Sequence, residues 1–215
     1  MTGRAVLFDM DGTLVDSEPA HHRAWVDVFA EYQLELPEGF ETGFTGASAQ
    51  AVYGQIVELT GLTASYEAVA LSKSRAFLRR RAELAARRGA MEGIATLRKL
   101  GVQMAIVSNS DRMLVDATLN AVNLAWPGLV SVSRNDVRQG KPDPESYLRA
   151  AWLLEMSPAD CIVVEDSPIG ATAGVAAGMT VIGWPDPHST DLIFPDGTLF
   201  ADPYDLMSTL MDLLL

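Results

Sequence analysis

The chain has 215 residues, of which 48% are hydrophobic and 20% charged, enough apolar material for one full core with a modest insertion. Its 16 basic and 28 acidic side chains give a net charge of −12, which repels nucleic acid and anionic membranes, so local cations must hold any anionic substrate. Cys161 is the only cysteine, which excludes an internal disulfide or a thiolate metal cluster and fits a reducing cytoplasm. The N-terminus turns acidic too early for a secretion signal, and no apolar run approaches membrane-spanning length. We therefore expect a cytoplasmic protein with no nucleic-acid, membrane or obligate protein partner.

Short runs rich in β-branched residues alternate with helical patterns along most of the chain. Strands this short and apolar are typical of a parallel sheet buried on both faces, and the alternation predicts a doubly wound, Rossmann-like α/β core. The expected strands are residues 5–9, 102–109, 129–132 (the weakest), 161–166 and 180–184, and the expected helices are residues 93–101, 112–122, 144–156 and 168–178.

One segment breaks this alternation. Between residues 17 and 88 only helical periodicity is found, at residues 21–32, 48–61 and 65–88. We expect residues 17–87 to form an inserted helical cap, and residues 1–16 and 88–215 to form the α/β core.

Polar side chains follow the expected strands at the point where each one ends. In open α/β sheets the carboxyl ends of the strands form the ligand-binding edge, so these side chains are expected to converge. Clustered carboxylates are costly unless they are paired or metal-bound, and carboxylate oxygens favour Mg²⁺. A lysine and a serine hydroxyl beside them favour a phosphoryl group. The converging residues are Asp9, Asp11, Ser108, Asn109, Lys141, Glu165 and Asp166.

Asp9 and Asp11 lie two residues apart and can serve different tasks. One carboxylate can attack phosphorus, while the other holds a proton for the leaving oxygen. The alternative, part of a calcium loop, lacks the third acidic position and the terminal glutamate of an EF-hand. Two further alternatives stay open: Asp166 as a helix cap, and Asn109 as either a phosphate ligand or a cap.

Four motifs carry a family resemblance: "DMDGT" (9–13), "VSNS" (107–110), "KPDP" (141–144) and "VVEDS" (163–167). In this order and spacing they resemble the motifs of the haloacid dehalogenase superfamily, in its branch of β-phosphoglucomutase-like phosphatases. The resemblance covers nearly the whole chain and includes a helical cap after the first strand. It implies Asp9 as nucleophile and Mg²⁺ ligand, and Asp11 as general acid/base and ligand through its backbone carbonyl. It further implies Ser108 and Lys141 as phosphate-binding residues, Lys141 as a restraint on Asp9, Asp166 as a metal ligand, and Glu165 as an acidic partner at the metal.

The resemblance also assigns positions in the cap. His21 falls where the mutases hold a hinge-side histidine that can couple closure to the acid/base. Gly46 falls in the substrate-specificity loop "TGASA" (45–49). The arginine that grips a second phosphate in the sugar-phosphate mutases is replaced here by Ala49, which weakens the mutase interpretation. Lys73 or Arg75 could supply a replacement cation, or both could lie on a solvated face.

We therefore predict a Mg²⁺-dependent phosphatase acting on a small phosphorylated metabolite, a sugar or sugar-acid phosphate, through an aspartyl phosphate. A β-phosphoglucomutase-like phosphomutase is the second hypothesis, since it would share the first step. A non-catalytic sensor of phosphorylated metabolites is the third. Dehalogenation is disfavoured because Asp11 and Mg²⁺ have no evident task on a carbon–halogen bond.

Overall fold

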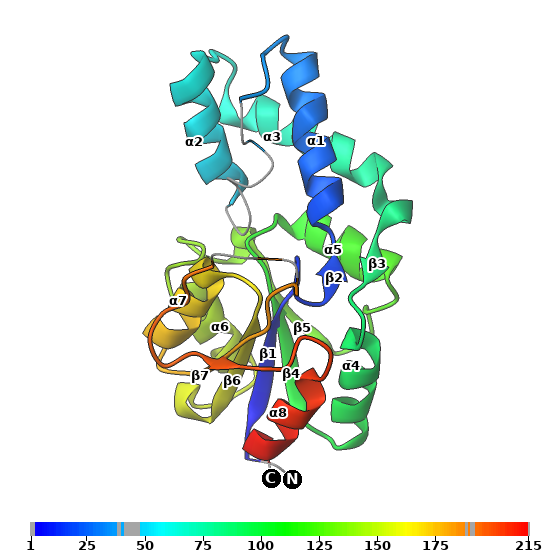
Figure 1. Cartoon of the computed structure of the whole chain (residues 1–215), viewed down its shortest axis with the longest axis vertical. Coiled ribbons are helices and arrows are strands. Elements are labelled where there is room, and N and C mark those ends of the chain that lie inside the picture. The colour runs from blue at the N-terminus through cyan, green and yellow to red at the C-terminus, as the bar shows by residue number, and fades with distance from the viewer. Residues whose placement is uncertain (1–2, 38–39, 41–47, 188, 190–191, 215) are drawn as a thin grey trace.

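The structure is a computed structural model that describes residues 3–37, 40, 48–187, 189 and 192–214. A parallel sheet of six strands lies at its centre, in the order β5-β4-β1-β6-β7-β8, with helices on both faces (Figure 1). The doubly wound α/β fold predicted from the sequence is therefore confirmed. The strands are β1 (Ala5–Asp9), β4 (Gln103–Val107), β5 (Val130–Val132), β6 (Cys161–Glu165), β7 (Thr180–Gly183) and β8 (Leu199–Phe200).

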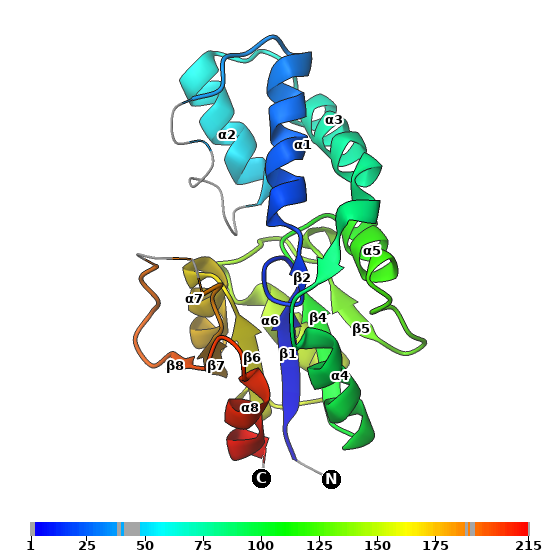
Figure 2. The ribbon, with the colours of Figure 1, turned by 45° about the vertical axis from the view of Figure 1, so that its right-hand side comes forward.

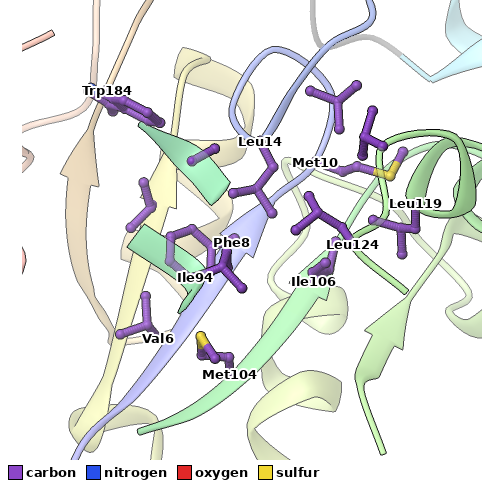
Figure 3. Packing of buried hydrophobic residues seen from close by; sticks show 14 of the residues in the cluster. Val6, Phe8, Met10, Leu14, Ile94, Met104, Ile106, Leu119, Leu124 and Trp184 are labelled. Atoms are coloured by element: carbon purple, nitrogen blue, oxygen red, sulfur yellow. The ribbon is translucent and has the colours of Figure 1, made fainter. Parts of the chain in front are cut away.

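Side chains of the central strand β1 alternate between two cores. Val6 and Phe8 pack on one face of the sheet, together with Ile106 and Trp184 (Figure 3), whereas Ala5 and Leu7 pack on the other. Both faces are therefore closed to water, as the uniformly apolar strands predict. The first face is covered by α4 (Ala90–Lys99), α5 (Arg112–Ala121) and α8 (Leu206–Leu214), and the second by α6 (Glu145–Leu153) and α7 (Pro168–Ala176).

Three helices stand beyond the carboxyl ends of the strands (Figures 1 and 2): α1 (Glu18–Glu31), α2 (Ala49–Thr60) and α3 (Tyr66–Arg79). They enclose a hydrophobic cluster of their own, centred on Trp25, Phe29 and Ile56. Two short strands, β2 (Val15–Asp16) and β3 (Ala85–Ala86), pair antiparallel where the chain leaves and re-enters the sheet region. We refer to α1–α3 with their connections as the cap.

The structure corrects the helix expected at residues 65–88. It ends at Arg79, because the Arg80 guanidinium folds back onto the Ala76 carbonyl and the Asp27 carboxylate. The chain then forms a 3-10 turn, Arg81–Glu83, before it pairs as β3. The sequence interpretation missed β2, β3, β8, α8 and two further 3-10 turns, Arg134–Asp136 and Pro158–Asp160. Among the described residues, no helix is both long and apolar enough to cross a bilayer.

Candidate active site

The register of the parallel sheet brings the ends of three strands together. Asp9, the last residue of β1, lies opposite Val107 of β4, and Phe8 lies opposite Val164 of β6. Ser108 and Glu165 therefore end up beside Asp9 at the same edge. Beyond Asp9 the chain turns back sharply, with the amides of Leu14 and Val15 both donating to the Met10 carbonyl.

Lys141 bridges two of these strand ends. Its Nζ donates to Asp9 Oδ1 at 2.6 Å, to Glu165 Oε1 at 2.6 Å and to the Val107 carbonyl at 2.9 Å. Burial by itself would lower the pKa of Lys141, but the two carboxylates raise it well above the ordinary value. The ammonium is therefore fixed in its charged form beside Asp9.

Glu165 is oriented toward Lys141 by its own partners. Its Oε1 also accepts from Tyr147 Oη at 2.7 Å, and its Oε2 accepts from Ser167 Oγ at 3.1 Å. The carboxylate lies directly over Gly170 of α7, where a β-carbon would overlap it. Both oxygens of Glu165 are thus used by protein donors, an arrangement more typical of an anchor for Lys141 than of a metal ligand.

Asp9, Glu165 and Asp166 form a buried carboxylate group whose ligand atoms lie within 4.8 Å of one another. Asp9 Oδ2 is buried and accepts no hydrogen bond from any described residue. Burial raises the pKa of Asp9 well above its usual range despite Lys141, and burial with the charge of Glu165 raises the pKa of Asp166 to about 8. Three buried carboxylates close together, one with an oxygen that accepts no hydrogen bond from the described residues, are suitable ligands for a hard divalent cation such as Mg²⁺.

The Asp11 carboxylate is held by a different set of donors. Asp11 Oδ2 accepts from Ser108 Oγ at 3.0 Å and Ser110 Oγ at 2.9 Å, while Oδ1 accepts from Ser17 Oγ at 2.6 Å and lies 3.2 Å from His21 Nε2. Burial alone would raise its pKa, but the charge of His21 and these hydrogen bonds lower it below the usual range. The two side chains therefore differ in their surroundings: Asp9 is held by an ammonium, whereas Asp11 is held by three hydroxyl groups and an imidazole.

Asn109 contacts the backbone on both sides of Lys141. Its Nδ2 donates to the Lys141 carbonyl at 3.1 Å, and its Oδ1 accepts from the Lys141 amide at 2.8 Å. The side chain thus fastens the loop that carries the lysine, a position that neither sequence alternative anticipated.

His21 links Asp11 to the cap. Its Nδ1 lies 2.8 Å from Lys73 Nζ, and its ring stacks on Phe77 of α3 with 4.2 Å between centroids. Burial lowers the pKa of Lys73 to about 8, and burial together with the Lys73 charge lowers the pKa of His21. Arg75, the alternative cap cation, is exposed. The expected specificity residue Gly46 lies outside the described residues.

Sequence reasoning missed several side chains that position the site. Ser17 and Ser110 hold Asp11, and Tyr147 holds Glu165. Thr13 Oγ1 donates to Asp166 Oδ1 at 3.0 Å. Ser110 and Thr13 lie within the quoted motifs and could have been found there, whereas Tyr147 lies on a helix and gave no signal.

Comparisons with known proteins identify the family of the chain. The family model of haloacid dehalogenase-like hydrolases matches residues 4–178. The chain is 34% identical to hexitol phosphatase A of Escherichia coli over 191 residues, 88% of this chain and 87% of that protein. It is 33% identical to 6-phosphogluconate phosphatase of the same organism over 206 residues, 92% and 90% of the two chains. The crystal structure of a putative β-phosphoglucomutase from Thermotoga maritima is similar with a TM-score of 0.75 at 26% identity, covering 98% of this chain and all of that one.

The chain therefore belongs to the haloacid dehalogenase-like hydrolases, and the resemblance found in its four motifs is confirmed.

Proposed function

We propose that this hydrolase is a Mg²⁺-dependent phosphatase that cleaves a small phosphorylated metabolite of the sugar-phosphate class through an aspartyl phosphate on Asp9. The observation that carries the proposal is Asp9 Oδ2, the buried carboxylate oxygen without a hydrogen bond in the described chain. Because Lys141 holds the other oxygen, Oδ2 is the atom left for a ligand. Phosphatase relatives named for 6-phosphogluconate and hexitol support the reaction and the substrate class.

Asp9 and Asp166 would hold the Mg²⁺ ion, with the backbone carbonyl of Asp11 as the resemblance implies. When bound, the ion would neutralise the crowded carboxylates and polarise the phosphoryl group. Glu165 would contribute indirectly, by keeping Lys141 charged and in place. Lys141 and the Ser108 hydroxyl would supply the phosphate contacts.

In the first step the Asp9 carboxylate attacks phosphorus, and the bond between phosphorus and the ester oxygen breaks. Asp11 gives a proton to the departing alkoxide, so an alcohol leaves; because the free site favours ionised Asp11, it takes up this proton when the substrate binds. In the second step water attacks the phosphorus of the aspartyl phosphate, and ionised Asp11 takes a proton from that water. The bond between phosphorus and the Asp9 oxygen breaks, which frees the Asp9 carboxylate and releases inorganic phosphate. The donors around Asp11 favour the ionised form that the second step needs. Closure of the cap would keep bulk water out during the first step.

The test is phosphate release from a panel of phosphate esters, with Mg²⁺ and with EDTA. We expect turnover only with Mg²⁺, and its loss in Asp9→Asn, while Asp212→Asn on the exposed face of α8 keeps full activity. Borohydride added during turnover should convert residue 9 to homoserine, because it reduces acyl phosphates. Equal rates for Asp9→Asn and the unmodified protein would refute the proposal.

A sugar phosphomutase is the second candidate, since the T. maritima structure carries that name. It would share the aspartyl phosphate but return the phosphoryl group to the sugar. Dependence on a bisphosphate primer, with isomerised sugar phosphate as the product instead of inorganic phosphate, would favour it.

A further inference from the structure

The cap contains a long stretch without a positive charge. Between Arg23 and Lys73 the sequence has no lysine or arginine, and it holds seven acidic residues. This stretch comprises most of α1, all of α2, the first half of α3 and their connections. None of these residues can therefore offer a positively charged side chain to the leaving group. The acidic residues are Asp27, Glu31, Glu35, Glu38, Glu41, Glu58 and Glu67.

The cations that border this stretch are held by other groups, except Arg75, which is exposed on the side of α3 away from Lys73. Lys73, the one nearest to the site, is buried with its Nζ 2.8 Å from His21 Nδ1, and it lies over the Phe77 ring. Arg23 is paired with Glu83 at 2.5 Å. Arg79 and Arg80 are paired with Asp27.

Among the described residues of the core, two cations near this edge of the sheet are engaged as well. Lys141 is neutralised by Asp9 and Glu165, and these contacts hold it beside the proposed nucleophile. Arg134 uses its guanidinium for the carbonyls of Val137 and Arg138, in the loop that leads to Lys141.

Acidic side chains also lie near Lys73 and near the carboxylate group. Asp111, at the N-terminal end of α5, is close enough to Lys73 and Tyr66 of α3 for its charge to act on both. Glu18, the first residue of α1, acts in the same way on Asp166.

A carboxylate or second phosphate on the leaving group would be desolvated under the cap without a partner. Such an uncompensated charge strongly disfavours binding, whereas hydroxyl groups can hydrogen-bond to neutral and acidic side chains alike. From this charge distribution, and resting on the proposed function, we infer that the preferred substrates are monophosphates of uncharged alcohols, such as polyols and neutral sugars. The inference excludes sugar-acid phosphates and bisphosphates as preferred substrates.

The test uses substrate pairs that differ only at one terminal carbon. The pairs are glucitol 6-phosphate with 6-phosphogluconate, glycerol 1-phosphate with 3-phosphoglycerate, and 2-hydroxyethyl phosphate with 2-phosphoglycolate. We expect kcat/KM with Mg²⁺ to favour the uncharged member of each pair by about 30-fold or more, the size expected for one unpaired buried charge. The preference should persist at 0.5 M salt, because salt screens a desolvated charge much less than an exposed one.

Variants that add a positive charge at one position test whether the missing cation causes the preference. Ala49 is the first residue of α2, at the end of that helix that faces the sheet (Figure 1). Ala49→Arg should reduce the preference about fivefold or more by giving the acid a partner. Leu59→Arg, which adds the same charge in the last turn of α2 at a position 63% exposed, should leave the preference unchanged.

Equal or faster turnover of the acidic members would overturn the inference while leaving the phosphatase assignment intact. The same holds if the two arginine variants shift the preference equally. Failure of every pair and of p-nitrophenyl phosphate alike would instead overturn the proposed function.

Discussion

Gly12 lies against the carboxylate of Asp166 with no room for a β-carbon between them. The glycine has φ +85°, which lets the chain turn back directly after Asp11, and its missing side chain lets Asp166 sit beside the turn. The conformation and the close approach both require glycine here, so the position links backbone shape to the carboxylate group.

Gly12→Ala should therefore damage the site more than the fold. The positive φ alone costs about 1–2 kcal/mol for an L-residue, and the added methyl group would displace Asp166. We expect Mg²⁺ affinity, measured by isothermal titration calorimetry, to fall about tenfold or more.

Gly197→Ala is the matched control, because Gly197 also has φ +85° but no atom near its added β-carbon. The Tm of both variants should fall by a few degrees, but the Mg²⁺ affinity should fall only in Gly12→Ala. Wild-type Mg²⁺ affinity in Gly12→Ala would contradict the argument.

Substitutions of Glu165 and of Asp166 should have different effects on Mg²⁺ affinity. The oxygens of Glu165 are occupied by Lys141, Tyr147 and Ser167. Asp166, in contrast, accepts a side-chain hydrogen bond from Thr13 at one oxygen. Glu165→Gln should change Mg²⁺ affinity by less than about threefold yet lower kcat strongly, since Lys141 loses one of its two counter-charges. Asp166→Asn should weaken Mg²⁺ binding about tenfold or more. Titration calorimetry with both variants decides the matter, and the reverse ranking would make Glu165 a metal ligand.

The Lys73 ammonium should hold down the pKa of His21. Its Nζ lies 2.8 Å from His21 Nδ1, and a neighbouring cation disfavours the imidazolium. Lys73→Met should therefore raise the pKa of His21, measured by NMR of the ¹⁵N-labelled imidazole in the metal-free protein. Arg75→Met, two residues away on the exposed side of α3, should leave that pKa unchanged. An unaltered His21 titration in Lys73→Met would show that the two side chains are uncoupled in solution.

Much of the site could be predicted because strand ends are encoded locally. The apolar runs before Asp9, Ser108 and Glu165 specify parallel strands, and parallel strands end at a common edge. The direction in which a side chain points at that edge is not encoded in the neighbouring sequence. Glu165 faces Lys141 because Tyr147 of α6 donates to it and Gly170 of α7 leaves space beneath it, and both contacts need the folded chain.

The helix expected at residues 65–88 shows the same limit. Its periodicity is that of a helix, but the end at Arg79 follows from contacts with Asp27 of α1 and from the pairing of β3 with β2. A two-residue strand is too short for a pattern to reveal it, so this connection between cap and sheet could not be predicted from the sequence.

Arg87, directly after β3, joins that connection to the active site. Its guanidinium donates to the carbonyls of Gly12, Trp184 and Pro185, and it stacks on the Trp184 ring with 3.7 Å to the centroid. Its amide donates to the Leu14 carbonyl at 2.9 Å. One side chain thus fastens the turn after Asp11 to the loop after β7, at the point where the cap re-enters the core.

Arg87→Lys should loosen this turn, because an ammonium is a point donor and cannot reproduce the planar fork that reaches three carbonyls. We expect faster hydrogen exchange at the amides of residues 12–15 in the metal-free protein, and a larger loss in kcat than in KM. Arg88→Lys is the matched control, since Arg88 is exposed and only approaches Tyr204, with 6.0 Å to the ring centroid. Unchanged exchange at residues 12–15 in Arg87→Lys would mean that the turn after Asp11 holds its shape without the guanidinium.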